Sequence, residues 1–321
     1  MVQVCATMGT QPMEKVIFMK KLLLCALAIT LLLIPPTAVA QQKTVVTSFY
    51  PIYILARNLT EGVSGITLHN LAAPDTGCLH DYQLLSGDMR VLSQAQVLLT
   101  NGAGMESYLD TVTAQFPSLV IVDASQGVPL LDDQGDPEPE TEDADHLHQG
   151  NPHIWLDASN AAQMVQNLGD GLAAAFPEHA DILRQNTQQY IQRLQALDQE
   201  LKEGLMGLAH KDIITFHEAF PYFAKAYGLH VAAVVTREPG EALSPAQLAE
   251  LVQLVRSLGA PPLFTEPQYP DLAARTLAAE TGAPVYQLDP LVTGPIDESA
   301  LTAYEDGMRE NMRVLKEALG N

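Results

Sequence analysis

The chain of 321 residues has few cysteines, few basic residues and a single tryptophan. Its three cysteines are too scattered for a disulfide framework or a CxxC metal site. The chain has 17 lysines and arginines and 38 aspartates and glutamates, which gives a net charge of −21. Nucleic-acid binding normally depends on basic side chains that neutralise the phosphates, so this charge argues against it. Apolar residues make up 47% of the chain, which excludes an intrinsically disordered protein. We therefore expect an acidic globular protein of about two domains.

Residues 1–40 predict an upstream extension followed by a signal peptide. Met19-Lys20-Lys21 is basic, residues 22–34 form an apolar segment interrupted only by Thr30, and Ala38-Val39-Ala40 supplies a small-x-small cleavage pattern, so that Gln41 is expected to begin the mature chain. Cys25 follows three leucines, where a lipid-anchor motif needs a small residue, so we do not expect a lipoprotein. The prediction is an exported protein, periplasmic or otherwise extracytoplasmic.

Two halves of the mature chain follow the same pattern, in which short β-branched runs alternate with amphipathic stretches. This alternation is typical of parallel βαβ units. It predicts an α/β fold with two similar lobes, each a four-stranded parallel sheet with flanking helices. The expected strands are 44–47, 66–70, 97–100 and 119–123 in the first lobe, and 212–215, 231–235, 262–264 and 284–288 in the second. The expected helices are 52–60, 88–94 and 106–115 in the first lobe, and 219–227, 245–258, 272–281 and 298–319 in the second.

One long helix is expected to join the lobes over residues 177–208, because Pro177 can open a helix and apolar residues then recur at spacings of three and four. The predicted domains are thus an N-terminal lobe over 41–176, the linking helix, and a C-terminal lobe over 209–321. A rigid linking helix favours limited motion of one lobe against the other. Residues 132–149 hold eight acidic residues, two histidines and no base, and predict a surface loop within the N-terminal lobe.

Four candidate metal ligands follow expected strands. His80 comes after the second strand, His153 after the fourth strand and the acidic loop, His217 after the fifth strand, and Asp289 after the eighth. Ligands of open α/β sheets bind beyond the carboxyl ends of the strands. Three imidazoles and one carboxylate from two lobes would form a four-coordinate site suited to Zn²⁺.

The segments around these residues resemble the ligand motifs of the zinc/manganese solute-binding proteins of ABC transporters. The resemblance rests on 74–80, Asn-Pro-His-Ile-Trp-Leu-Asp at 151–157, Thr-Phe-His-Glu-Ala-Phe-Pro-Tyr-Phe at 215–223, and Leu-Asp-Pro-Leu at 288–291. It implies that His80, His153, His217 and Asp289 bind the metal. It also implies a monomeric extracytoplasmic carrier, not an enzyme, that captures Zn²⁺ between two lobes and delivers it to a membrane permease. Mn²⁺ is the alternative cargo, although histidine at position 217 favours zinc.

Several alternatives remain open. Cys78, two residues before His80, could compete as a thiolate ligand, although a partly buried loop thiol is favoured. Glu266, Glu218 and Asp157 are candidates to support the ligands, with a structural hydrogen bond favoured for Glu266. An exported zinc hydrolase with Glu218 as general base is the alternative class, but HExxH and GxSxG motifs are absent.

Two other features of the sequence have a plain structural interpretation beside a functional one. The Asn101-Gly102-Ala103-Gly104 turn lacks the third glycine of a dinucleotide loop, so a tight strand-to-helix turn is favoured. His146 and His148 lie in the acidic loop and fit either a weak capture site or a solvated segment.

Overall fold

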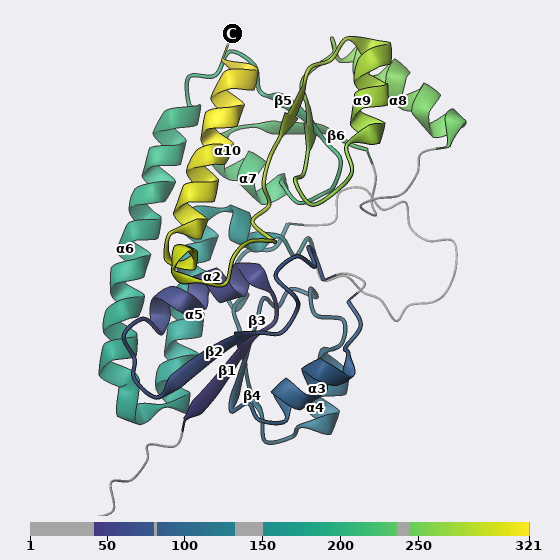
Figure 1. The fold of residues 1–321 in the computed structure, drawn as a ribbon. Coiled ribbons are helices and arrows are strands. Elements are labelled where there is room, and N and C mark those ends of the chain that lie inside the picture. The colour runs from purple at the N-terminus through teal and green to yellow at the C-terminus, as the bar shows by residue number, and fades with distance from the viewer. Residues whose placement is uncertain (1–41, 80–81, 132–149, 236–243, 321) are drawn as a thin grey trace, which may run out of the picture. The chain divides into compact units, whose positions relative to one another are not determined.

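The computed structural model describes residues 42–79, 82–131, 150–235 and 244–320. The signal peptide expected over 1–40, His80, and the acidic loop with His146 and His148 lie outside these residues. Residues 42–321 form one compact unit, which contains both predicted lobes. Figure 1 shows the course of the chain through this unit.

The first lobe is built on a sheet whose four described strands are all parallel, in the order β2-β1-β3-β4. Val45 and Val46 of the central strand β1 are fully buried, as expected for a parallel sheet covered by helices. The strands are β1 (Lys43–Thr47), β2 (Ile66–Asn70), β3 (Val97–Thr100) and β4 (Val120–Asp123). The helices of this lobe include α2 (Tyr50–Leu59), α3 (Ser86–Leu92) and α4 (Leu109–Gln115).

The second lobe repeats this arrangement in the part of the chain that the structure describes, with parallel strands in the order β6-β5-β7-β8. The prediction of two similar four-stranded parallel sheets is therefore confirmed. The strands are β5 (Asp212–Thr215), β6 (His230–Val234), β7 (Leu263–Thr265) and β8 (Val285–Gln287). The helices are α7 (Pro221–Tyr227), α8 (Pro245–Ser257), α9 (Leu272–Thr281), the short η3 (Glu298–Leu301) and α10 (Ala303–Leu319).

The long helix between the sheets begins as a 3₁₀ turn, η2 (Pro177–His179), and continues as α6 (Ala180–Leu205). Its leucines at the predicted spacing are buried, and α6 packs against α2 of the first lobe and against α7 and α10 of the second. In Figure 1 it runs alongside α10. The expected linking helix is present, although its α-helical part ends at Leu205 instead of residue 208.

A further long helix, α5 (Ala158–Ala175), was not predicted. It follows the 3₁₀ turn η1 (Ile154–Leu156) and packs along α6. A Cβ atom added to Gly169 would lie 2.1 Å from the Thr187 hydroxyl oxygen of α6, so glycine permits this close approach. The buried residues Ala161, Val165, Leu168 and Leu172 of α5 recur at spacings of three and four, so the sequence does carry a helical pattern here, and the prediction missed it.

One buried hydrophobic cluster includes residues of both lobes and of the helices between them. It contains the fully buried Trp155, whose Nε1 donates a hydrogen bond to the carbonyl of Pro290 at 2.7 Å. The Tyr304 hydroxyl donates in turn to the Trp155 carbonyl at 2.6 Å. A smaller cluster, centred on Ile214 and Leu263, lies between the second sheet and helices α8 and α9. No helix among the described residues is long and apolar enough to span a membrane.

Candidate metal centre

His153 lies directly before η1, in the segment that follows β4. Its side chain is fully buried. The Asn151 side-chain oxygen accepts a hydrogen bond from the His153 backbone N–H at 2.9 Å and lies 3.0 Å from the ring Nδ1. An amide oxygen can only accept, so Nδ1 carries the proton. The lone pair of the neutral ring is therefore on Nε2, the atom that a metal ion would use.

Asn151 is itself held by the second lobe. Its side-chain amide donates to the Glu218 carbonyl at 2.9 Å, and its own carbonyl accepts from the Tyr222 hydroxyl at 2.8 Å. The bond to Glu218 occupies the side-chain nitrogen of Asn151, so the side-chain oxygen faces His153. The orientation of a first-lobe imidazole thus depends on contacts with the segment that carries His217.

His217 follows β5 and is 1% exposed. Its Nδ1 lies 3.1 Å from Oε1 of Glu266, which is 2% exposed and follows β7. The other oxygen of Glu266 accepts from the Gln268 amide at 2.6 Å. The carboxylate therefore holds the proton of His217 on Nδ1 and directs Nε2 towards His153, the arrangement in which carboxylates commonly support metal-binding histidines.

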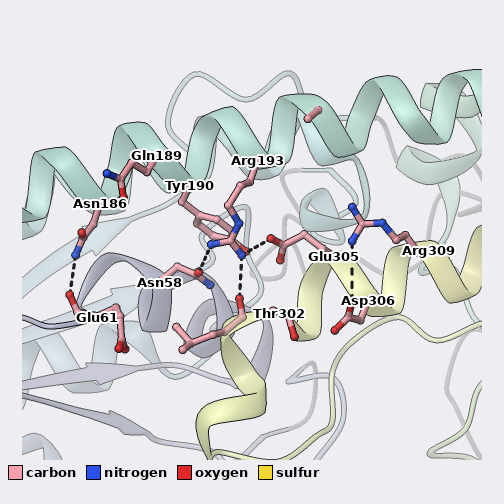
Figure 2. Close-up of a pocket in the computed structure, with 12 residues that line it drawn as sticks. Asn58, Glu61, Asn186, Gln189, Tyr190, Arg193, Thr302, Glu305, Asp306 and Arg309 are labelled. Atoms are coloured by element: carbon pink, nitrogen blue, oxygen red, sulfur yellow. Dashed lines mark hydrogen bonds and ion pairs between the residues drawn. The ribbon is translucent and has the colours of Figure 1, made fainter.

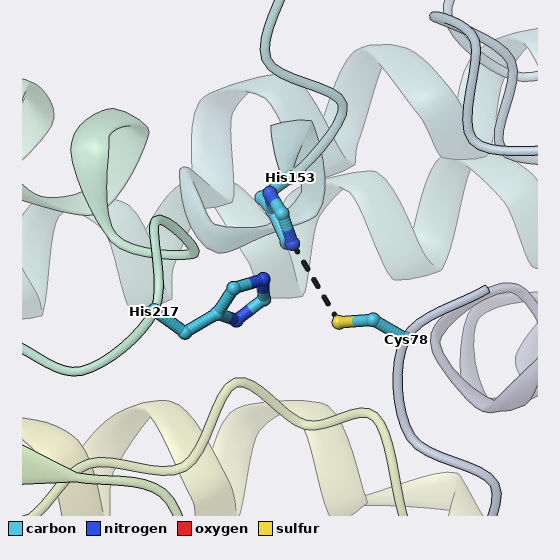
Figure 3. A group of neighbouring side chains, drawn as sticks. All are labelled: Cys78, His153 and His217. Atoms are coloured by element: carbon cyan, nitrogen blue, oxygen red, sulfur yellow. Dashed lines mark hydrogen bonds between the residues drawn. The ribbon is translucent and has the colours of Figure 1, made fainter. Parts of the chain in front are cut away.

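The rings of His153 and His217 are brought together, with centroids 4.8 Å apart and planes at 82°. Cys78, which follows β2, completes a group whose candidate ligand atoms all lie within 4.8 Å of one another. The Cys78 Sγ is 3.6 Å from His153 Nε2. Figure 3 shows these three side chains pointing towards one another from three separate segments. Burial, followed by the negative charge of Glu266, raises the pKa of the Cys78 thiol.

Asp289 follows β8 as predicted and is partly buried, but it is not a member of this three-residue group. Its Oδ1 accepts from the Leu291 backbone at 2.7 Å, while the Asn311 side chain of α10 bonds both to its N–H and to its carbonyl. Burial raises the pKa of Asp289, the Leu291 bond lowers it, and the charge of Glu266 raises it further. Two mutually repelling carboxylates at one sheet edge favour a nearby cation. The fourth predicted ligand, His80, lies outside the described residues.

The structure also assigns roles to the supporting candidates. Asp157 caps α5, with its side chain accepting from the Ser159 N–H at 2.8 Å. Glu266 makes its hydrogen bond with His217, a candidate ligand. Asn151 was not predicted as a functional residue, and its position two residues before His153 is the signal that could have found it.

The strand-to-helix turn after β3 supports the same region. The backbone N–H groups of Asn101 and Gly102 donate to the carboxylate of Glu106 at 2.7 and 3.1 Å, so they are occupied by a side chain of the protein. The Asn101 side chain donates to the carbonyl of Pro152 at 3.0 Å, directly before His153. This arrangement agrees with the tight turn favoured over a dinucleotide loop.

A polar groove with a volume of about 530 Å³ lies elsewhere, between α6, α2 and the start of α10. Figure 2 shows Arg193 at its centre. Its guanidinium donates to Asn58 Oδ1 at 2.9 Å and to the Leu301 carbonyl at 3.1 Å, and it pairs with Glu305. Because Arg193 connects α6 with elements of both lobes, the groove is a structural junction.

Residues 45–318 match the profile of a family described as zinc-uptake complex component A, periplasmic. The chain belongs to this family. The family's description names a component of a zinc-uptake complex.

The sequence identity between this chain and individual zinc-binding relatives is low. A zinc-binding lipoprotein, AdcA, of Streptococcus pneumoniae serotype 4 is 28% identical over 285 residues, which cover 86% of this chain and 56% of the relative. The chain thus spans about half the length of that curated relative.

Two solved structures have the same fold as the described chain. The crystal structure of Zn(II)-bound AdcA from Streptococcus pneumoniae matches with a TM-score of 0.73 and 26% identity, over 87% of this chain and 58% of that one. The solute-binding protein FpvC of Pseudomonas aeruginosa in complex with Mn²⁺ also gives a TM-score of 0.73, at 23% identity, over 87% of this chain and 98% of that one. The agreement extends across both sheets and confirms the predicted fold class.

Proposed function

We propose that this protein captures Zn²⁺ outside the cytoplasm and delivers it to a membrane permease. The observation that carries the proposal is the meeting of His153 and His217, two buried imidazoles from different lobes with ring centroids 4.8 Å apart. Two buried imidazoles that approach one another from different lobes can bind one divalent cation between them.

The supporting hydrogen bonds point to a metal site more than to a core pair of histidines. Asn151 holds a proton on Nδ1 of His153, and Glu266 does the same for His217. Both lone pairs are thereby placed on Nε2, as in histidines that ligate zinc. His80 and Asp289 are the two further ligands we propose, on the strength of their positions after β2 and β8.

Zinc is favoured over manganese by the donor set. Imidazole nitrogen suits Zn²⁺, whereas Mn²⁺ prefers sites dominated by carboxylates and water. Relatives of this chain are named as zinc-binding, and one structural neighbour holds Mn²⁺, so Mn²⁺ remains the alternative cargo. Export by the signal peptide over 1–40, followed by handover to a permease, agrees with the family's description as a periplasmic uptake component.

The proposal is tested by measuring zinc binding to metal-stripped protein by equilibrium dialysis. We expect one tightly held ion per chain and a loss of affinity of at least about 100-fold in His217→Ala, because the site loses a ligand and leaves Glu266 without its partner. The matched control is His210→Ala, a change at an exposed histidine that should leave affinity unchanged. Equal binding by the two variants would refute the site.

A further inference from the structure

We propose that Cys78 is a ligand of the captured ion and takes one of the two positions that His153 and His217 leave for further ligands, so that the site combines a thiolate with imidazoles. This inference rests on the proposed function and names a donor atom that changes the chemistry of the site. Cys78 approaches from the segment after β2, whereas His153 and His217 come from the segments after β4 and β5. Their candidate ligand atoms form one group in spite of these separate origins.

The spacing of sulfur and nitrogen fits tetrahedral zinc. Zinc–sulfur bonds are about 2.3 Å and zinc–nitrogen bonds about 2.0–2.1 Å, so two such ligands at the tetrahedral angle lie about 3.6 Å apart. The Cys78 Sγ and His153 Nε2 are 3.6 Å apart. The same separation suits a thiol that donates its proton to Nε2, which is the competing interpretation. Zinc would take the place of that proton, and one proton would be released for each thiolate–zinc bond formed.

The backbone around Cys78 is shaped to present this side chain. Gly77 has φ +85°, a conformation that other residues rarely adopt, and a Cβ atom there would lie 3.4 Å from the Tyr269 hydroxyl oxygen. The Tyr269 ring stands 6.3 Å from that of His217. The second lobe therefore packs against the turn that carries Cys78. The contact lies next to His217, the histidine with which Cys78 would share the ion.

A sulfur donor has a consequence for the choice of cargo. Thiolate is a soft ligand that binds zinc, cobalt or cadmium well and contributes little to manganese binding. Cys78→Ser should therefore weaken zinc binding by about 100-fold while Mn²⁺ binding changes by less than about threefold. This difference would make Cys78 a residue that determines specificity. Equal losses for both ions would contradict that role.

The direct test replaces zinc with Co²⁺ in the full chain. We expect a near-ultraviolet sulfur-to-cobalt charge-transfer band in the unaltered protein and its loss in Cys78→Ser, with the visible d–d bands of bound cobalt retained. Thr76→Ser is the matched control, because it changes an exposed residue on the same turn and should keep the band. Bound cobalt without a charge-transfer band, or a band that survives in Cys78→Ser, would overturn the inference and leave zinc capture intact. A protein that binds neither zinc nor cobalt would refute the proposed function as well.

Alkylation supplies a readout that does not depend on cobalt. Saturating zinc should slow the modification of Cys78 by iodoacetamide by at least about tenfold, since a metal-bound thiolate is a poorer nucleophile. His217→Ala provides the comparison, because its weakened zinc binding should remove the protection at the same zinc concentration. An alkylation rate unaffected by zinc in a protein shown to hold the ion would contradict ligation by Cys78.

Discussion

The carboxylate of Glu266 holds the imidazole of His217 by its Nδ1 atom at 3.1 Å, and both side chains are almost completely buried. A buried carboxylate beside a histidine raises the basicity of the opposite ring nitrogen and fixes the orientation of the ring. Gln268 holds the second oxygen, so the carboxylate cannot turn away without breaking another bond. Glu266 therefore belongs to the machinery of the proposed site although it need not touch the ion.

Glu266→Gln should lower zinc affinity by about 10- to 100-fold, because the amide keeps the shape of the side chain but lacks its charge. Competition with a chelating zinc indicator measures the change. Glu250→Gln, an exposed substitution on α8, is the control and should behave as the unaltered protein. An unchanged affinity in Glu266→Gln would show that His217 does not need its carboxylate to bind the ion.

Zinc should change the fluorescence of Trp155 with one-to-one stoichiometry. The chain's sole tryptophan is fully buried and its ring centroid lies 5.2 Å from that of His153, so a charge on the imidazole alters its surroundings. Titration of metal-stripped protein measures the response, and deletion of residues 138–149 should leave it largely intact. Zinc that binds by dialysis without a fluorescence change would argue that His153 is not a ligand.

Stability should fall between acidic and neutral pH because of Glu106. Burial raises the pKa of Glu106 from 4.5 to about 7, although the hydrogen bonds that its carboxylate accepts lower the pKa in part. The folded protein therefore keeps a proton that the unfolded chain releases, and the free energy of unfolding decreases by up to about 3 kcal/mol from about pH 4.5 to 7. Glu106→Gln should remove this component. Chemical denaturation at about pH 5 and pH 8 measures it, and an unchanged pH dependence in the variant would assign the effect to other groups.

Arg193→Ala should destabilise the fold by about 1–3 kcal/mol. The change leaves Glu305, which is 5% exposed, without its partner and removes bonds to both lobes, although the half-exposed guanidinium moderates the cost. Arg309→Ala removes an exposed pair with Glu200 and should cost less than about 1 kcal/mol. Thermal denaturation of the two variants compares them, and equal losses would contradict a role for Arg193 as a junction.

The strands could be predicted from the sequence because parallel sheets require short, continuous apolar runs such as Val97-Leu98-Leu99. The helix over 158–175 was not predicted, although its buried residues Val165, Leu168 and Leu172 recur at helical spacing. The spacing alone could not show its close contact with α6, because that contact depends on the absence of a side chain at Gly169 opposite Thr187.

At the site, sequence position placed His153 and His217 beyond the carboxyl ends of strands in two different sheets, and the structure brings their rings together. Their partners Asn151 and Glu266 were harder to identify. Each acts through a single hydrogen bond to a ring nitrogen, and such a bond depends on the path of the backbone between elements. The contact of Cys78 with His153 depends on the turn at Gly77, whose backbone conformation is not apparent from the spacing of residues.

The shared strand order of the two sheets has an evolutionary consequence. All the candidate donors sit in connections that leave the sheets, while the strands themselves supply buried aliphatic side chains. An exchange confined to one connection, such as the segment between β2 and α3, can therefore swap a donor atom without disturbing either sheet. Such a scaffold would diversify its ionic preferences one connection at a time.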